Sequence, residues 1–358
     1  MQNLSLTQGV PQQLNKHQKI ATAVGVLSLF ILLLSAFNID FPNQALWFFA
    51  SISLLTGSII YYAYATYKNS IPGIKNNGVW FNALASKGVW GWMIGILLTS
   101  FYVVLYFFPQ YLGLNNDGAN TGLISFFDPL SKVLSGNPAS QWFVYGTFYT
   151  IAVVAFGVKF IWKYRHNSYQ RIRTISVMFF QLGFAFIIPE LMARLNGDDF
   201  YLPYYDLKNI WPLNYYNFEQ YRIDGFINAG NIGLALLFFG ILSTFVITPI
   251  LTYKYGKRWY CSWVCGCGGL AETAGDPFRH LSDKSMFAWK VERWVIHSVL
   301  VFVVLMTTAV IYSYLGYDAE KYWLDKNTFL ISVAVFLGLV LAGVFAFKKN
   351  ELKKDARY

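Results

Sequence analysis

The chain has 358 residues, of which 56% are hydrophobic and only 13% carry a charge. Soluble domains usually carry about 25% charged residues, so this composition excludes a soluble globular fold and favours a protein that lies in a lipid bilayer. The formal net charge of +10 is explained by topology and contact with anionic lipid, and we expect no nucleic-acid partner.

Eight apolar stretches are long enough to cross a bilayer, which takes roughly 20 residues in a helix. They lie near residues 20–37, 45–67, 89–108, 142–162, 175–192, 232–253, 295–316 and 328–347. Tryptophans at or near many of the proposed ends fit the aromatic belts of a membrane interface. We expect an all-α, polytopic bundle of about eight transmembrane helices, with residues 1–358 forming a single transmembrane domain.

The distribution of positive residues predicts the orientation of these helices. If the N-terminus is cytoplasmic, the inside segments hold 21 of the 28 Lys and Arg residues and the outside loops hold 5. Positive residues concentrate on the cytoplasmic side, so both termini are expected there, in an inner (cytoplasmic) membrane. The loop 254–294 is then cytoplasmic, and the loop 195–230, rich in aromatic and acidic residues, faces the outside.

Glu190 follows Pro189 near the outer end of the fifth proposed span. Ionisable groups inside a span are costly and usually mark a functional site. One interpretation is an ion pair with Arg194, four residues further on. The other is a catalytic role for Glu190 as the proton acceptor of a quinol pocket, with the loop 195–230 as a lid or docking surface. A folded cap without a ligand is the alternative for that loop.

All three cysteines of the chain, Cys261, Cys265 and Cys267, fall within seven positions. Thiolates are soft ligands that suit iron–sulfur clusters, zinc and copper(I). The cytoplasm keeps thiols reduced, so the spacing favours a metal or cluster site over a disulfide. Three buried, inert cysteines are the alternative.

The glycines that follow Cys265 predict a break in the helix. Gly266, Gly268 and Gly269 are expected to release the backbone from the helical conformation. Their amides would then approach cluster sulfurs closely and donate hydrogen bonds, which raise the reduction potential.

The segment 256–265, Gly-Lys-Arg-Trp-Tyr-Cys-Ser-Trp-Val-Cys, resembles the G-R-x-W-C-x-x-x-C-P element of membrane-bound 4Fe–4S proteins of the NapH/NosR-like polyferredoxin type. The resemblance implies a polytopic electron-transfer protein in which Cys261 and Cys265 bind a cluster. Gly266 replaces the family's proline, and the family's second cysteine element and ferredoxin-like tail have no counterpart in this sequence. We expect a shortened relative or a fragment that matches the N-terminal half of such a protein.

A 4Fe–4S cluster or a structural zinc usually has four protein ligands, whereas this chain has three cysteines. His280, thirteen residues past Cys267, is the candidate fourth metal ligand, and Asp276 is a weaker one. A solvated interfacial histidine is the alternative for His280. A partner protein or a second copy of the chain is a further source of a thiolate.

These patterns together favour a membrane electron-transfer subunit that links the quinone pool to a ferredoxin-like (iron–sulfur) partner or a flavoprotein. The cofactors expected are an iron–sulfur cluster, most simply 4Fe–4S, and a quinone. Two alternatives stay open: a membrane scaffold with a zinc-stabilised cysteine loop, and a transporter-like protein with incidental cysteines.

The positive-residue bias generates a topology prediction. Reporter fusions at Tyr358 and within 254–294 are expected to report the cytoplasm, and fusions at Asn116 and Tyr204 the outside. An outside signal from a reporter within 254–294 would contradict both the orientation and the reducing environment assumed for the cysteines.

Overall fold

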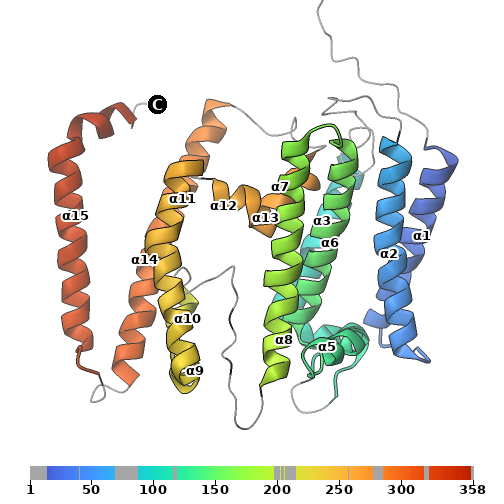
Figure 1. The fold of residues 1–358 in the computed structure, drawn as a ribbon, viewed down its shortest axis with the longest axis horizontal. Helices are drawn as coiled ribbons and strands as arrows, with labels where there is room; N and C mark the ends of the chain where they lie inside the picture. Colours follow the sequence, from blue (N-terminus) through green and yellow to red (C-terminus); the bar gives the residue numbers. More distant parts are fainter. Residues whose placement is uncertain are drawn as a thin grey trace, which may run out of the picture. The chain divides into compact units, whose positions relative to one another are not determined.

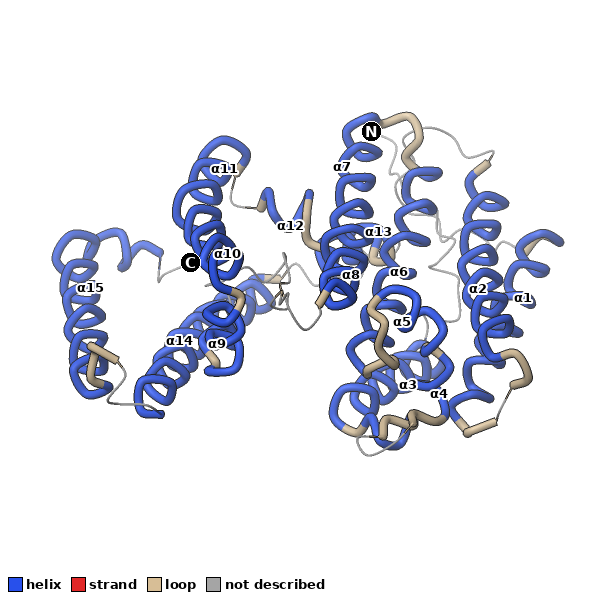
Figure 2. Tube along the Cα trace, turned by 60° about the horizontal axis from the view of Figure 1, so that its bottom comes forward, coloured by secondary structure: helices blue, strands red, loops and turns tan. Residues whose placement is uncertain are grey.

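A computed structural model gives the fold drawn in Figures 1 and 2. The elements formed by the described residues are all helices, and no strand occurs among them. The chain divides into two compact units, each considered by itself: residues 1–208 with 248–282, here unit 1, and residues 209–247 with 283–358, unit 2. The structure describes residues 14–39, 41–68, 88–115, 119–196, 202, 205, 215–256, 258–276, 285–317 and 322–355.

Seven helices of the described chain are long and apolar enough to cross a membrane. They are Lys16–Ala36, Gln44–Tyr67, Gln141–Lys163, Ser168–Leu195, Gly230–Tyr255, Met286–Tyr317 and Lys326–Ala346. Each overlaps one span expected from the sequence, so the all-α character is confirmed, and the seven helices fit a multi-pass membrane protein. The remaining expected span, 89–108, corresponds to α3 (Gly88–Phe107), which has 20 residues and carries no charged side chain.

In unit 1, the helices α1 (Lys16–Ala36) and α2 (Gln44–Tyr67) form an adjacent pair that small residues hold together (Figure 1). Ser28 Oγ donates a hydrogen bond to the Ser51 carbonyl at 2.6 Å. A side-chain carbon added at Gly25 would lie 2.8 Å from Ser58 Oγ. Small residues let two helices approach closely, and that close contact is the main source of attraction between helices in lipid.

The core of unit 1 is aromatic and lies where the short helices α4 (Gly122–Phe126) and α5 (Asp128–Leu134) meet the longer ones. Phe48 and Phe127 are fully buried, with ring centroids 5.0 Å apart in an edge-to-face contact. Figure 1 shows α5 at one end of the helices α6 and α8. This packing fixes the start of α6, which carries part of the site described below.

The span Ser168–Leu195 is not a uniform α-helix. It consists of α7 (Ser168–Phe179), the π-helical segment η3 (Phe180–Ile187) and α8 (Ile188–Leu195). Segments of π-helix are rare and occur frequently at functional sites. Here the π-helical segment carries Gln181, whose side chain is buried.

Unit 2 contains α10 (Gly230–Leu242), α14 (Met286–Tyr317) and α15 (Lys326–Asp355). The apolar side chains of α14 and α15 are mostly exposed, which fits a surface that contacts lipid.

Much of the expected outer loop 195–230 lies outside the described residues. From Tyr215 the chain forms the 3-10 helix η4 (Tyr215–Phe218) and then α9 (Gln220–Asn228). The Tyr215 ring lies 6.3 Å from the Phe302 ring of α14, so this part of the loop packs within unit 2. Its role as a lid or docking surface stays a prediction.

Candidate functional site

The cysteines lie on a hairpin of two short helices in unit 1, α12 (Trp259–Trp263) and α13 (Gly266–Thr273). The hairpin follows α11 (Thr248–Tyr255), which ends at Gly256. Gly256 has a φ of 89°, a left-handed conformation that glycine adopts without steric cost. The segment expected to be a cytoplasmic loop therefore contains two ordered helices.

The glycines after Cys265 do not end the helix, so that expectation is wrong. α13 begins at Gly266, with Cys265 as its N-cap residue. The glycines serve close packing instead, because a side-chain carbon at Gly268 would overlap the carbonyl oxygen of Cys261. α12 and α13 therefore contact each other where Gly268 meets the Cys261 carbonyl, and this contact holds the backbone of the three cysteines together.

Gly266 and Gly269 let α13 pack directly against α6 (Gln141–Lys163) and the span Ser168–Leu195. A side-chain carbon at Gly266 would lie 2.8 Å from the Tyr149 ring and would overlap the Gln181 side-chain oxygen. One at Gly269 would overlap Val177. Any larger residue at either position would push the hairpin away from the spans.

These contacts place the cysteines beside the middle of α6. Tyr149 lies fourteen residues before Lys163, the last residue of α6, which corresponds to about 21 Å along the helix axis. The hairpin therefore lies alongside the helices, not beyond their ends, and Figure 1 shows α12 and α13 at this level of α7.

A buried ion pair anchors the far end of the hairpin to α6. Asp276, which has 0% of its surface exposed, accepts from Lys163 Nζ at 2.5 Å and from Tyr164 Oη at 2.9 Å. Lys163 is also buried and lies over the rings of Tyr67 and Tyr164. Both carboxylate oxygens of Asp276 are thus engaged, so this residue anchors the hairpin and offers no free oxygen as a fourth ligand.

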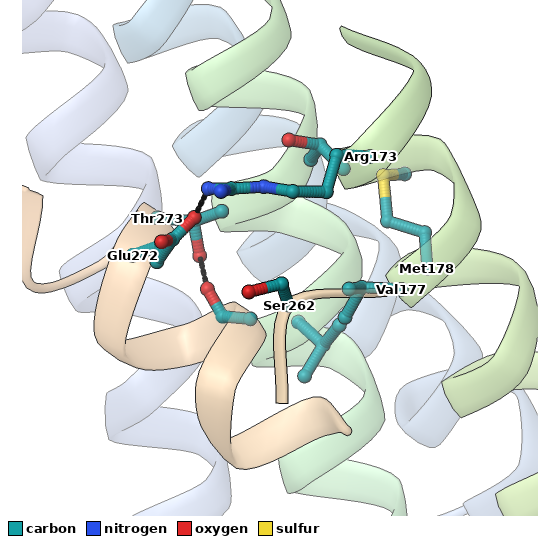
Figure 3. A pocket seen from close by; sticks show the side chains of 9 residues that line it. Arg173, Val177, Met178, Ser262, Glu272 and Thr273 are labelled. Atoms are coloured by element: carbon teal, nitrogen blue, oxygen red, sulfur yellow. Dashed lines mark hydrogen bonds and ion pairs between the residues drawn. The ribbon is translucent and has the colours of Figure 1, made fainter. Parts of the chain in front are cut away.

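Two more contacts reinforce this anchor. Lys159, one turn before Lys163, is buried, and its Nζ donates to the Thr273 carbonyl at 3.4 Å. Arg173 of α7 forms an ion pair with Glu272 of α13, which Figure 3 shows beside Thr273. The hairpin is therefore held through charged groups on two different helices.

The pocket in Figure 3 lies between α7 and the hairpin and has a volume of about 10 Å³. Ser262, Val177 and Thr273 are among its lining residues. A cavity of roughly 10–15 Å³ holds one water molecule, so this pocket is too small for a cofactor. A metal group would have to lie on the cysteine side of the hairpin.

The three thiols differ in environment. Cys261 and Cys267 are exposed and Cys265 is half-buried. The Tyr149 hydroxyl donates to Cys267 Sγ at 3.1 Å. Among the described residues, no three His, Cys, Asp or Glu side chains are close enough together to hold a metal ion, so the thiols do not converge in this conformation.

The chemistry of the donor set nevertheless fits an iron–sulfur cluster. Three soft thiol ligands lie within one hairpin, and the first turn of α13 holds the amides of Gly266, Cys267 and Gly268. Amides in the first turn of a helix have no partner within the helix, and the helix dipole favours negative charge there. An anionic thiolate-bound group would thus be stabilised at this position.

Sequence reasoning missed Tyr149 and Gln181, which α6 and η3 bring to the hairpin. Gln181 is 2% exposed, and its Nε2 donates to Thr150 Oγ1 at 3.1 Å while its Oε1, next to Gly266, has no hydrogen-bond partner. The available signal in the sequence was the polar amide of Gln181 within a span rich in phenylalanine. The partner helix that it faces could not be read from the sequence.

The other candidate residues are not brought to the cysteines. His280 lies outside the described residues, so its role as a ligand stays a prediction. Glu190 lies in α8, nine residues or about 13 Å along the span from Gln181. Glu190 forms no ion pair with Arg194, which donates instead to the Val133 carbonyl, so the structural interpretation of that pair is wrong.

Comparison with known proteins bears on this hairpin directly. Residues 237–285 match the family model of a 4Fe-4S binding domain. The match includes α12, α13 and all three cysteines, and it supports an iron–sulfur binding segment. No curated protein and no solved structure matches the chain. The narrower NapH/NosR-like type suggested by the sequence stays a prediction.

The buried ion pair generates a prediction about stability in this 4Fe-4S binding segment. Asp276→Asn removes the negative charge that Lys163 Nζ contacts in a buried site, and is expected to lower the free energy of unfolding by about 3–5 kcal/mol. The measurement is the unfolding midpoint in detergent micelles. Lys132→Met is the matched control, because its pair with Asp128 is exposed and worth about 0–1 kcal/mol. Equal effects of both variants would contradict the anchoring role.

Proposed function

We propose that the chain is a membrane electron-transfer protein whose cysteine hairpin holds one 4Fe–4S cluster. The observation that carries the proposal is the coincidence of three thiols, the N-terminus of α13 and the matched 4Fe-4S segment in one hairpin. The seven apolar helices support a multi-pass location, for which we propose the inner (cytoplasmic) membrane.

Cys261, Cys265 and Cys267 would hold the cluster as thiolates. We propose His280 as the fourth ligand, because it lies close after the hairpin in sequence. A thiolate from a second copy of the chain or from a partner protein is the other source. Closing the site requires the three thiols to turn toward one another, which the exposed positions of Cys261 and Cys267 allow.

A bound 4Fe–4S cluster supplies one-electron chemistry. The chain's own part is to bind it, to stabilise its charge and to exclude water. The Tyr149 hydroxyl donates to Cys267 Sγ, and the N-terminus of α13, where Cys267 lies, favours negative charge. The packing of Gly266 and Gly269 against the spans keeps water from the inner side of the hairpin.

We further propose that electrons pass between a quinol and a ferredoxin-like or flavoprotein partner. Glu190 would accept the proton that a quinol releases. The support is its position in a span as a half-buried carboxylate without an ion pair among the described residues. Pro189, buried beside it in the first turn of α8, has no amide hydrogen to donate.

The first prediction from this proposal concerns the ligands. Each of Cys261→Ser, Cys265→Ser and Cys267→Ser is expected to abolish the visible absorbance of protein reconstituted anaerobically with iron and sulfide. Ser262→Ala, in the same hairpin, is the matched control and should keep it. Iron and sulfide content unchanged in the triple variant would contradict the assignment. If the protein contains zinc and no sulfide, the interpretation changes to a membrane scaffold with a zinc-stabilised cysteine loop, because zinc has no redox chemistry.

The second prediction concerns Glu190. Glu190→Gln keeps the size but removes the proton acceptor, and is expected to slow quinol-dependent reduction of the cluster roughly 100-fold or more. Stopped-flow absorbance measures the rate. Arg194→Gln is the control and should leave the rate intact, because Arg194 contacts a backbone carbonyl. A normal rate in folded Glu190→Gln protein would rule out the catalytic role.

A further inference from the structure

A continuous line of tyrosine and tryptophan side chains leads away from Cys267. It starts with the hydrogen bond from the Tyr149 hydroxyl to Cys267 Sγ at 3.1 Å. The Tyr149 ring stacks on Tyr145, with 5.7 Å between centroids and an angle of 26° between planes. Tyr145 in turn contacts Tyr102 of α3 at 5.8 Å.

The line continues from Tyr102 to the start of α6. Tyr102 and Tyr106 are one turn apart on α3, with centroids 5.6 Å apart. Tyr106 meets the Trp142 ring edge-to-face at 4.8 Å, and its carbonyl accepts from Gln141 Nε2 at 3.2 Å. Trp142 is the second residue of α6 and is 52% exposed, so the line ends at an accessible aromatic ring.

The positions of these residues show that the line runs along the axis of α6. Trp142, Tyr145 and Tyr149 follow the spacing i, i+3, i+7 and therefore share one face of the helix. The seven residues from Trp142 to Tyr149 correspond to about 10 Å along the axis. The line thus covers the part of α6 that separates the cysteine hairpin from the end at which the helix begins.

Packing alone does not explain the residue types. The aromatic side chains of α6 that pack into the core of unit 1 are phenylalanines, Phe143 and Phe148, which contact Phe186 and Phe127 respectively. The aromatic side chains that lead from Cys267 to Trp142 are tyrosine and tryptophan, with Leu105 and Gln141 beside them. Hydroxyl groups are costly in an apolar environment, so phenylalanine would pack at lower cost there. Tyrosine and tryptophan are the aromatic side chains that give up an electron most readily.

We propose that Tyr149, Tyr145, Tyr102, Tyr106 and Trp142 form an electron route between the cysteine hairpin and the Trp142 end of α6. This proposal rests on the proposed function of the hairpin, and it adds that electrons reach the hairpin from the Trp142 end of α6. A one-electron donor at Trp142, such as a quinol, loses an electron, and the acceptor held by the cysteines gains it. The rings act as a bridge and keep their oxidation state and their protons.

The route can be tested in the opposite direction in full-length, metal-free protein. A ruthenium polypyridyl complex is attached to an azide-bearing residue in place of Pro138, which is exposed four residues before Trp142. Light and a cobalt(III) pentaammine quencher produce ruthenium(III), while cobalt(III) is reduced to cobalt(II). Ruthenium(III) takes an electron through the route, and Cys267 loses that electron and releases its thiol proton to water. A nitrone traps the resulting thiyl radical.

Mass spectrometry then compares the nitrone adduct on Cys267 with that on Cys261, which is also exposed but does not contact the line. We expect several-fold more adduct on Cys267. Tyr145→Leu and Tyr149→Phe should each lower the Cys267 adduct several-fold and leave the Cys261 adduct unchanged. Tyr149→Phe keeps the ring that packs on Gly266. Tyr111→Leu, an exposed tyrosine outside the line, is the control and should change neither adduct.

Equal adducts on Cys261 and Cys267, or an undiminished Cys267 adduct in both variants, would overturn the route. The measurement does not depend on the cluster. If the protein fails to bind iron and sulfide but Cys267 is selectively oxidised, the proposed function is overturned and the route is upheld. If the protein binds iron and sulfide but Cys267 is not selectively oxidised, the route is overturned and the proposed function is upheld.

Discussion

The buried carboxylate of Asp276 is the constraint on which the cysteine hairpin depends. A charge with no exposed surface is tolerated only when it is paired and hydrogen-bonded, and Lys163 and Tyr164 provide both partners. Because both partners lie at the end of α6, the carboxylate fixes where the chain emerges from α13. The direction of α13 along α6, and with it the position of the cysteines, follows from this anchor together with the Arg173–Glu272 ion pair.

Close packing at glycines determines the rest of the hairpin's position. With the end of α13 anchored, Gly266 and Gly269 allow its first turn to touch Tyr149, Gln181 and Val177. The helix N-terminus, with its free amides, is thereby held beside the thiols. One short helix thus brings together Cys267, an electrostatic environment that favours negative charge and the contact with Tyr149.

The same arrangement explains why polar residues occur inside the spans. Lys159, Gln181 and Tyr149 would each be costly in lipid, yet each faces the hairpin or its anchor. Their cost is offset by contacts with backbone or side chains of another segment. The tyrosines that follow Tyr149 toward Trp142 contact one another and Trp142 in an unbroken series, and this continuity is what suggests a role in electron transfer.

Much of the fold could be predicted from the sequence, because a bilayer imposes length and apolar composition on every span. Seven expected spans correspond to long apolar helices, and α3 to the eighth. The cysteine spacing likewise indicated an iron–sulfur segment, since thiolates are soft ligands that suit such clusters. The extent of α13 was not predicted, because glycine suits both a helix break and a close helix contact.

The sequence by itself determined the all-helical character, the helices long and apolar enough to cross a membrane and the place of the cysteines, since these depend on composition and local spacing. Only the tertiary structure decided what surrounds them. Asp276 pairs with a lysine 113 residues earlier in the chain, and Tyr149 reaches a cysteine 118 residues later. Arg194 contacts the Val133 carbonyl instead of its near neighbour Glu190. Contacts between residues so distant in sequence depend on which helices pack together, and a local sequence pattern does not determine that packing.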